Sequence, residues 1–121
     1  MVKLALYSFA VFLLLTSCKK EGYGDLVISV SNSTSSSYSV GVWIDGSNKG
    51  SFVVLANQEG NYSGLCSDQM YAASLQNVRV LNYIPSGKHK IELINDANNE
   101  VMSSMSIDLN VDGCSNAMFF W

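Results

Sequence analysis

Apolar and polar residues alternate along much of the chain from residue 25 onward. Leu26, Ile28 and Val30 recur at every second position, and residues 40–44 repeat this spacing. Because successive side chains of a strand point to opposite faces, the spacing predicts half-buried strands. The predicted strands cover residues 25–31, 38–45, 51–55, 78–84, 88–93, 102–111 and 114–121.

Turn-forming residues separate these strands. Residues 32–37 form a polar serine-rich loop, and residues 45–50 have the composition of a turn. The Asp-Gly pair at 112–113 is typical of a tight turn. Residues 68–76 predict a loop or one helical turn, and no segment keeps a helical period. About seven short strands with closely spaced turns predict an all-β fold, an antiparallel β-sandwich.

The amino-terminal residues follow a different pattern. Lys3 precedes an almost wholly apolar run from Leu4 to Leu15, and two small residues lead to Cys18. A basic start, an apolar run of about 7–15 residues and a small-residue cleavage site predict a secretory signal peptide at residues 1–17. The run is shorter than the roughly 20 apolar residues that a transmembrane helix needs.

The cleavage site, "LTSC" at residues 15–18, resembles the lipobox of bacterial lipoproteins. The resemblance implies that the thiol of Cys18 receives a diacylglycerol, that cleavage occurs just before it, and that the new amino group is acylated. A thiolate is the sulfur nucleophile that such a thioether requires. Three acyl chains would hold the protein on a membrane durably. The alternative is an ordinary secreted protein with a cysteine near its cleavage site.

Residues 18–24 predict a short lipidated tether before a domain at residues 25–121. Lys19 is not an aspartate, which by analogy with other lipoproteins indicates the bacterial outer membrane. The stretch Cys-Lys-Lys-Glu at 18–21 is similar to the surface-export tether of Bacteroidota lipoproteins. A solvated charged linker is the alternative, so the surface and periplasmic sides both stay open.

The charge balance argues against one class of partner. Seven Lys and Arg minus Lys3 leave six after residue 17, against ten Asp and Glu in the same part. This mildly acidic chain has no basic block, so we expect no nucleic-acid partner. The size predicts one small domain.

Cys66 and Cys114 remain once Cys18 is lipidated. Export places them in an oxidising compartment, where two cysteines allow one intramolecular disulfide. Closing this loop would stabilise the fold by roughly 3–4 kcal/mol. Two free buried thiols are the alternative. A metal site is disfavoured, because the cysteines lack metal-ligand spacing and the chain has one histidine.

Three segments carry a further resemblance. "YSVGVWIDGSNKG" at 38–50, "IPSGKHKIELI" at 84–94 and "IDLNVDGCSNAMFFW" at 107–121 resemble small β-sandwich modules of cell-envelope proteins, akin to PEGA modules, and the endings of short Bacteroidota lipoproteins. The resemblance implies an immunoglobulin-like or transthyretin-like sandwich, a Cys66–Cys114 pair and no particular activity. The longer segment around Cys66 departs from that pattern.

Catalytic and metal-binding chemistry is sparse. His89, the only histidine, lies in an alternating strand, where a packed side chain is expected rather than a general base. No G-x-S-x-G motif is present, and the carboxylates that could pair for catalysis lie in turns. Acidic turns at 45–48 and 96–100 could offer oxygens to calcium, but neither matches the twelve-residue calcium loop. We therefore expect no enzyme, no cofactor and no metal.

Aromatic residues are the candidate ligand contacts. Trp43, Tyr62 and Tyr71 could present exposed rings to an envelope glycan or protein. Trp43 shares a face with Gly41, and we expect it to pack in the core. The predicted function is a lipid-anchored envelope module for binding or structural support. The alternatives are a small lipoprotein inhibitor of a host or envelope enzyme such as lysozyme, with Tyr62-Ser63-Gly64 as a faint hint, and an enzyme with a polar cleft.

Overall fold

The computed structural model describes residues 22–60 and 62–121, so the predicted signal peptide and residues 18–21 of the predicted tether lie outside the described residues. The described chain contains seven strands and two short helices. They are β1 (Tyr23–Ser31), β2 (Tyr38–Ile44), β3 (Ser47–Val54), η1 (Leu65–Ser67), α2 (Gln69–Ser74), β4 (Val78–Pro85), β5 (Gly87–Asn95), β6 (Val101–Leu109) and β7 (Cys114–Phe120).

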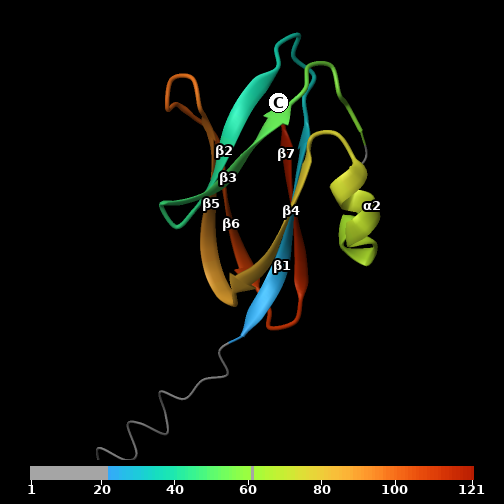
Figure 1. The fold of residues 1–121 in the computed structure, drawn as a ribbon, viewed down its shortest axis with the longest axis vertical. Helices are drawn as coiled ribbons and strands as arrows, with labels where there is room; N and C mark the ends of the chain where they lie inside the picture. Colours follow the sequence, from blue (N-terminus) through green and yellow to red (C-terminus); the bar gives the residue numbers. More distant parts are fainter. Residues whose placement is uncertain (1–21, 61) are drawn as a thin grey trace, which may run out of the picture.

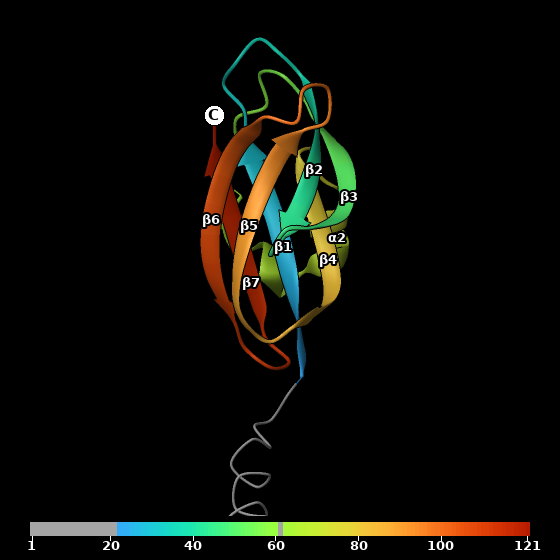
Figure 2. The ribbon, with the colours of Figure 1, turned by 90° about the vertical axis from the view of Figure 1, so that its left-hand side faces the viewer.

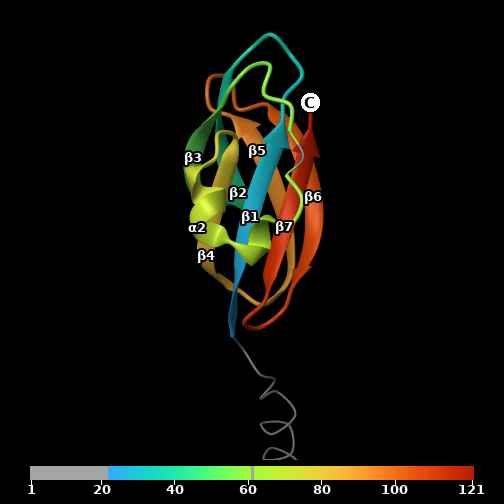
Figure 3. The same cartoon turned by 90° about the vertical axis from the view of Figure 1, so that its right-hand side faces the viewer.

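The strands form two sheets that pack face to face (Figures 1 and 2). Sheet I has the order β4-β1-β7, and sheet II has the order β3-β2-β5-β6. Helix α2 covers the outer face of sheet I (Figure 3). The prediction of an all-β sandwich with about seven strands is confirmed.

One neighbouring pair departs from the predicted antiparallel arrangement. β1 and β7 run parallel, in a register from Asp25 opposite Cys114 to Ser31 opposite Phe120. The other paired strands are antiparallel. Parallel neighbours need a long crossover connection, and here the whole of sheet II and β4 separate β1 from β7 in the sequence.

The main core lies between the two sheets. β1 and β2 contribute Leu26, Ile28, Val30, Val40, Val42 and Ile44. The other strands contribute Val54, Leu81, Ile84, Ile91, Leu93, Leu109, Ala117 and Phe119. Burying one such aliphatic or aromatic side chain stabilises the fold by about 1.5–3 kcal/mol. The predicted alternation of β2 is therefore confirmed, with every second residue in the core.

The prediction that β1 is half-buried is wrong. Residues 26–30 are all buried, because the segment that carries η1 and α2 packs on the outer face of sheet I. Val27 lies there with Leu65, Ala72 and Val78 in a second cluster. Both faces of β1 are thus covered, which is expected for the central strand of a sheet with a layer on each side.

The β2–β3 connection is tighter than the sequence indicated. Asp45 (φ 51°) and Gly46 (φ 80°) both adopt positive φ and connect Ile44 directly to Ser47. Two positive-φ residues are typical of a type I′ hairpin turn. β3 therefore begins at Ser47, four residues earlier than the predicted start at 51.

Candidate functional site

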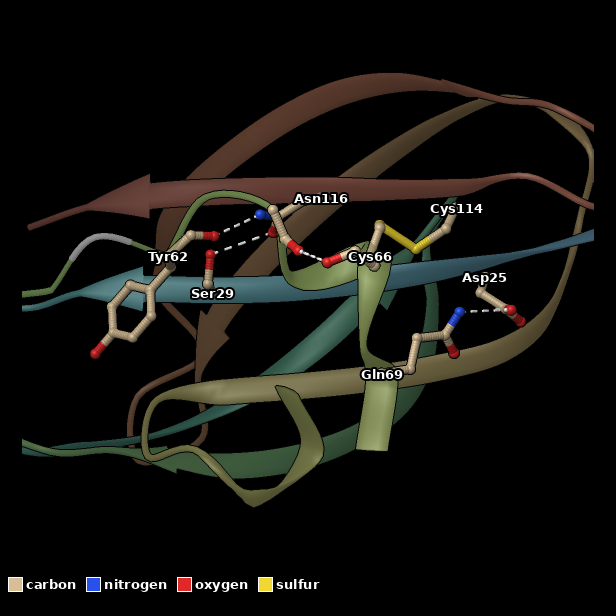
Figure 4. Close-up of a disulfide and its surroundings, with 9 residues drawn as sticks. Asp25, Ser29, Tyr62, Cys66, Gln69, Cys114 and Asn116 are labelled. Atoms are coloured by element: carbon tan, nitrogen blue, oxygen red, sulfur yellow. Dashed lines mark hydrogen bonds between the residues drawn. A yellow bond between two sulfur atoms is a disulfide. The ribbon is translucent and has the colours of Figure 1, made fainter. Parts of the chain in front are cut away.

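A disulfide joins Cys66 of η1 to Cys114 at the start of β7 (Figure 4). The Cα atoms lie 5.7 Å apart, within the ordinary range for a disulfide. The predicted pairing is confirmed, and the alternative of two free thiols is excluded. The bond fastens the layer over sheet I to an edge strand of that sheet.

Hydrogen bonds hold the same layer on the sheet. Gln69 of α2 donates Nε2–H to Oδ2 of Asp25 over 2.9 Å, and Asn116 donates Nδ2–H to the carbonyl oxygen of Tyr62 over 2.6 Å (Figure 4). The Asp68 carboxylate caps α2 by accepting from the backbone N–H of Tyr71. A six-residue helix is too short to be stable alone, so these contacts maintain it.

Trp43 does not pack in the core, so that prediction is wrong. Val40, Val42 and Ile44 occupy the core side of β2, which leaves Trp43 half-buried on the outer face of sheet II. A Cβ atom added at Gly41 would lie 3.0 Å from Nε1 of Trp43, so the indole lies over this glycine.

Tyr62 and Tyr71 belong to the opposite side of the sandwich. Tyr62 is half-buried and packs against the second cluster around Val27. Tyr71 lies on α2 and is 59% exposed. The three predicted aromatic contacts therefore do not form one site, because sheets I and II lie between Trp43 and the other two residues.

His89 is packed, as the sequence indicated, with 11% of its side chain exposed. Its Nδ1 lies 2.5 Å from Oδ2 of Asp45, and its Nε2 contacts the carbonyl oxygen of Pro85. Burial opposes protonation of the ring, but these hydrogen bonds and the charge of Asp45 outweigh it and raise the pKa of His89. The backbone N–H of Lys90, and then His89, lower the pKa of Asp45.

The described residues form neither a metal-binding cluster nor a membrane-spanning helix. Across residues 22–60 and 62–121, no three His, Cys, Asp or Glu side chains gather closely enough to hold a metal ion. Both carboxylate oxygens of Asp45, in one of the turns that could offer oxygens to calcium, are engaged by His89 and Lys90. In the same described ranges, no helix is long and apolar enough to cross a bilayer.

The sequence did not reveal a cleft at the amino-terminal end of β1. It has a volume of about 690 Å³, and we call it the tyrosine cleft. Its lining residues are Gly22, Tyr23, Gly24, Asp25, Asn82, Tyr83, Val111 and Asp112. The backbone N–H of Asp112 donates to the carbonyl oxygen of Tyr23, which brings the β6–β7 turn against β1.

An irregularity in β4 exposes the second tyrosine of the cleft. Gly24 pairs with Ile84 and Leu26 pairs with Leu81, so the single residue Asp25 faces both Asn82 and Tyr83. Such a β-bulge changes the direction of a side chain. Tyr83 takes φ 59°, and the residue is 81% exposed. The polar pair Asn82 and Tyr83 inside an apolar strand is the sequence feature that marks this site. The strand pattern alone does not predict the bulge.

Comparisons of the chain with protein-family models, with curated proteins and with solved structures found no match. The protein is a disulfide-bonded β-sandwich, and its tyrosine cleft is an open surface site lined by aromatic and acidic residues.

Proposed function

We propose that this protein is a lipid-anchored module of the bacterial cell envelope that binds or supports another envelope component without catalysing a reaction. The disulfide between Cys66 and Cys114 carries the proposal, because such bonds form and persist in exported proteins. An exported protein whose apolar leader ends on "LTSC" is a substrate for lipid attachment at Cys18.

The position of the domain agrees with a short tether. Gly22 is the first described residue and follows Cys18 by four positions. Four extended residues reach at most about 14 Å, so a lipid on Cys18 would keep the amino-terminal end of β1 close to the membrane surface. The tyrosine cleft lies at this end and offers a place for a ligand.

The non-catalytic part of the proposal is supported by the state of His89. This is the only histidine in the sequence, and both of its ring nitrogens are engaged by Asp45 and Pro85. A general base needs a free nitrogen within reach of the proton that it removes. His89 is therefore not placed to act as the general base of the alternative enzyme function.

Mass spectrometry of the full chain, expressed in a Gram-negative bacterium, tests the anchor. We expect a chain that begins at Cys18 and carries a diacylglycerol and an amide-linked acyl chain, recovered in the outer membrane. The Cys18→Ala variant should keep its leader and incorporate no labelled fatty acid. Wild-type protein with Met1 in place and an unmodified Cys18 would refute the anchor. Protease treatment of intact cells then separates surface from periplasmic display.

A further inference from the structure

We propose that the tyrosine cleft binds its ligand through an organic ammonium group, of the kind found in choline, in amino sugars and in lysine side chains. The inference deepens the proposed binding role and rests on it, but it does not depend on the lipid at Cys18. Two aromatic rings, two carboxylates and a strained backbone carry it.

The aromatic rings supply the first part of the recognition. Tyr23 and Tyr83 line the same cleft and are 58% and 81% exposed. A cation over the face of an aromatic ring is attracted by the negative charge of that face, and ammonium ligands are commonly held in this way. Two exposed rings on adjacent strands therefore offer more than one such contact.

The carboxylates supply charge complementarity. Asp25 and Asp112 line the cleft, and none of its described lining residues is a lysine, arginine or histidine. Gln69, which donates to Oδ2 of Asp25, is itself uncharged. A cleft with two carboxylates and no cation of its own in this lining attracts an ammonium ion and repels an acidic ligand.

The backbone of Tyr83 indicates that this arrangement is costly to the fold. A bulky residue at positive φ is a genuine outlier, and its backbone conformation is energetically unfavourable. Because Tyr83 is 81% exposed, little packing within the domain offsets the cost. A ring held outward at a bulge is instead available to a ligand.

The volume of the cleft sets the size of the ligand group. About 690 Å³ lies within the usual range of roughly 300–1,000 Å³ for small-molecule sites. A trimethylammonium group or one amino-sugar ring is small enough to enter and to contact Tyr23 and Tyr83 while its charge faces Asp112. We expect weak binding of the isolated group, since the site is open.

Matched small molecules test the inference. Choline, glucosamine and N-acetylglucosamine are titrated into the full purified chain in a polyoxyethylene detergent, which has no ammonium or sugar head group. We expect choline and glucosamine to bind with a Kd of about 1–10 mM, and N-acetylglucosamine to bind at least tenfold more weakly because acetylation removes its charge. Added salt should weaken the binding of choline and glucosamine.

Four variants separate recognition from folding. Tyr83→Asn removes the ring, but asparagine tolerates positive φ, so the variant should be at least as stable as the wild type while binding falls at least tenfold. Asp112→Asn removes one charge, and asparagine suits the φ of 55° at this position. The variant should also bind choline and glucosamine at least tenfold more weakly. Tyr83→Phe keeps the ring and should retain binding. Tyr71→Ala, outside the cleft, is the matched aromatic control.

Three results would overturn the inference. The first is equal binding of glucosamine and N-acetylglucosamine, which would mean that the cleft recognises a sugar ring and not its charge. The second is no binding of choline or glucosamine at about 50 mM. The third is unchanged binding in a folded Tyr83→Asn or Asp112→Asn variant. A lipidated chain that fails these titrations would still be an envelope module, and an unlipidated chain that passes them would still have the site.

Discussion

The Nδ1 atom of His89 lies 2.5 Å from Oδ2 of Asp45, so a side chain of β5 is tied to the turn between β2 and β3. The second ring nitrogen contacts the carbonyl oxygen of Pro85, where the chain passes from sheet I to sheet II. Both partners are hydrogen-bond acceptors, and a neutral imidazole has only one N–H. Only the protonated ring can donate to both acceptors at once, which agrees with the raised pKa of His89.

This link makes stability depend on pH. The raised pKa of His89 means that its contribution is complete below the ordinary value of 6.5 and is lost as pH rises through the folded-state pKa. The lowered pKa of Asp45 means that its contribution is complete above 3.8 and is lost as pH falls through the folded-state pKa. The pair therefore stabilises the fold most between these two values.

Urea unfolding at a series of pH values measures the effect. We expect the midpoint of the wild type to fall as pH rises from 6.5 toward 8.5, and the His89→Gln variant to show a flatter profile in this range. A variant profile that runs parallel to the wild type would contradict the role of His89.

The disulfide should make a large contribution to stability. Replacing both Cys66 and Cys114 by serine removes a cross-link between residues 48 positions apart, which the chain-entropy relation values at about 4 kcal/mol. Chemical denaturation should show this loss. Reduction of the wild type should give a similar loss, whereas a reductant should not affect the double variant.

The buried side chain of Asn32 organises the loop after β1. Its Nδ2–H groups donate to the carbonyl oxygens of Ser36 and Leu55, and its Oδ1 accepts from the backbone N–H and the hydroxyl of Thr34. Asn32→Ala leaves these groups without their partner and should reduce the free energy of unfolding by roughly 2–4 kcal/mol.

The exposed Asn98 gives a matched control for that measurement. Its Oδ1 accepts from the backbone N–H of Glu100 in a solvated turn, so Asn98→Ala should cost only about 0.5 kcal/mol. Equal losses in the two variants would mean that burial of Asn32 does not determine its contribution.

Gly24 lies where a side chain has no room. An added Cβ atom would lie 2.7 Å from the carbonyl oxygen of Asn110, 2.8 Å from Cγ of Leu109 and 3.0 Å from the carbonyl oxygen of Gly113. Two of these atoms belong to the backbone of the β6–β7 turn and yield less easily than a side chain. Gly24→Ala should therefore destabilise the fold by about 2–3 kcal/mol in denaturant unfolding.

Gly60→Ala is the control for this steric argument. The three atoms nearest to its added Cβ atom all belong to the side chain of Tyr62, at 3.1 Å or more, and that side chain can shift. We expect a loss of less than about 1 kcal/mol. A Gly24→Ala variant as stable as Gly60→Ala would show that the β6–β7 turn can move away from β1.

Local features of the fold could be predicted from the sequence where neighbouring residues determine them. The spacing of Val40, Val42 and Ile44 predicted the buried face of β2. The turn-forming residues at 45–50 predicted the turn that follows, although the turn itself is shorter than this segment. The disulfide followed from a different kind of reasoning, the redox state of exported proteins, and its geometry agrees.

Features that depend on distant contacts could not be predicted in this way. Ser29 alternates with apolar residues in β1 and suggested a solvent face, but the layer carrying η1 and α2 buries it. Periodicity also does not identify the neighbour of a strand, so the parallel pairing of β1 with β7 was missed. At the bulge, residue type favours Asn82 for a positive φ, because asparagine adopts it more readily than tyrosine does, whereas the positive φ occurs at Tyr83.

The position of β1 in sheet I also has a mechanical consequence. The described chain enters the fold through this strand, which is central in its sheet and has hydrogen-bonded ladders on both sides, to β4 and to β7. A pull along β1 from Gly22 loads both ladders in shear, so many hydrogen bonds must rupture together instead of opening one after another. Such a geometry suits a domain that has to withstand tension applied through its amino terminus.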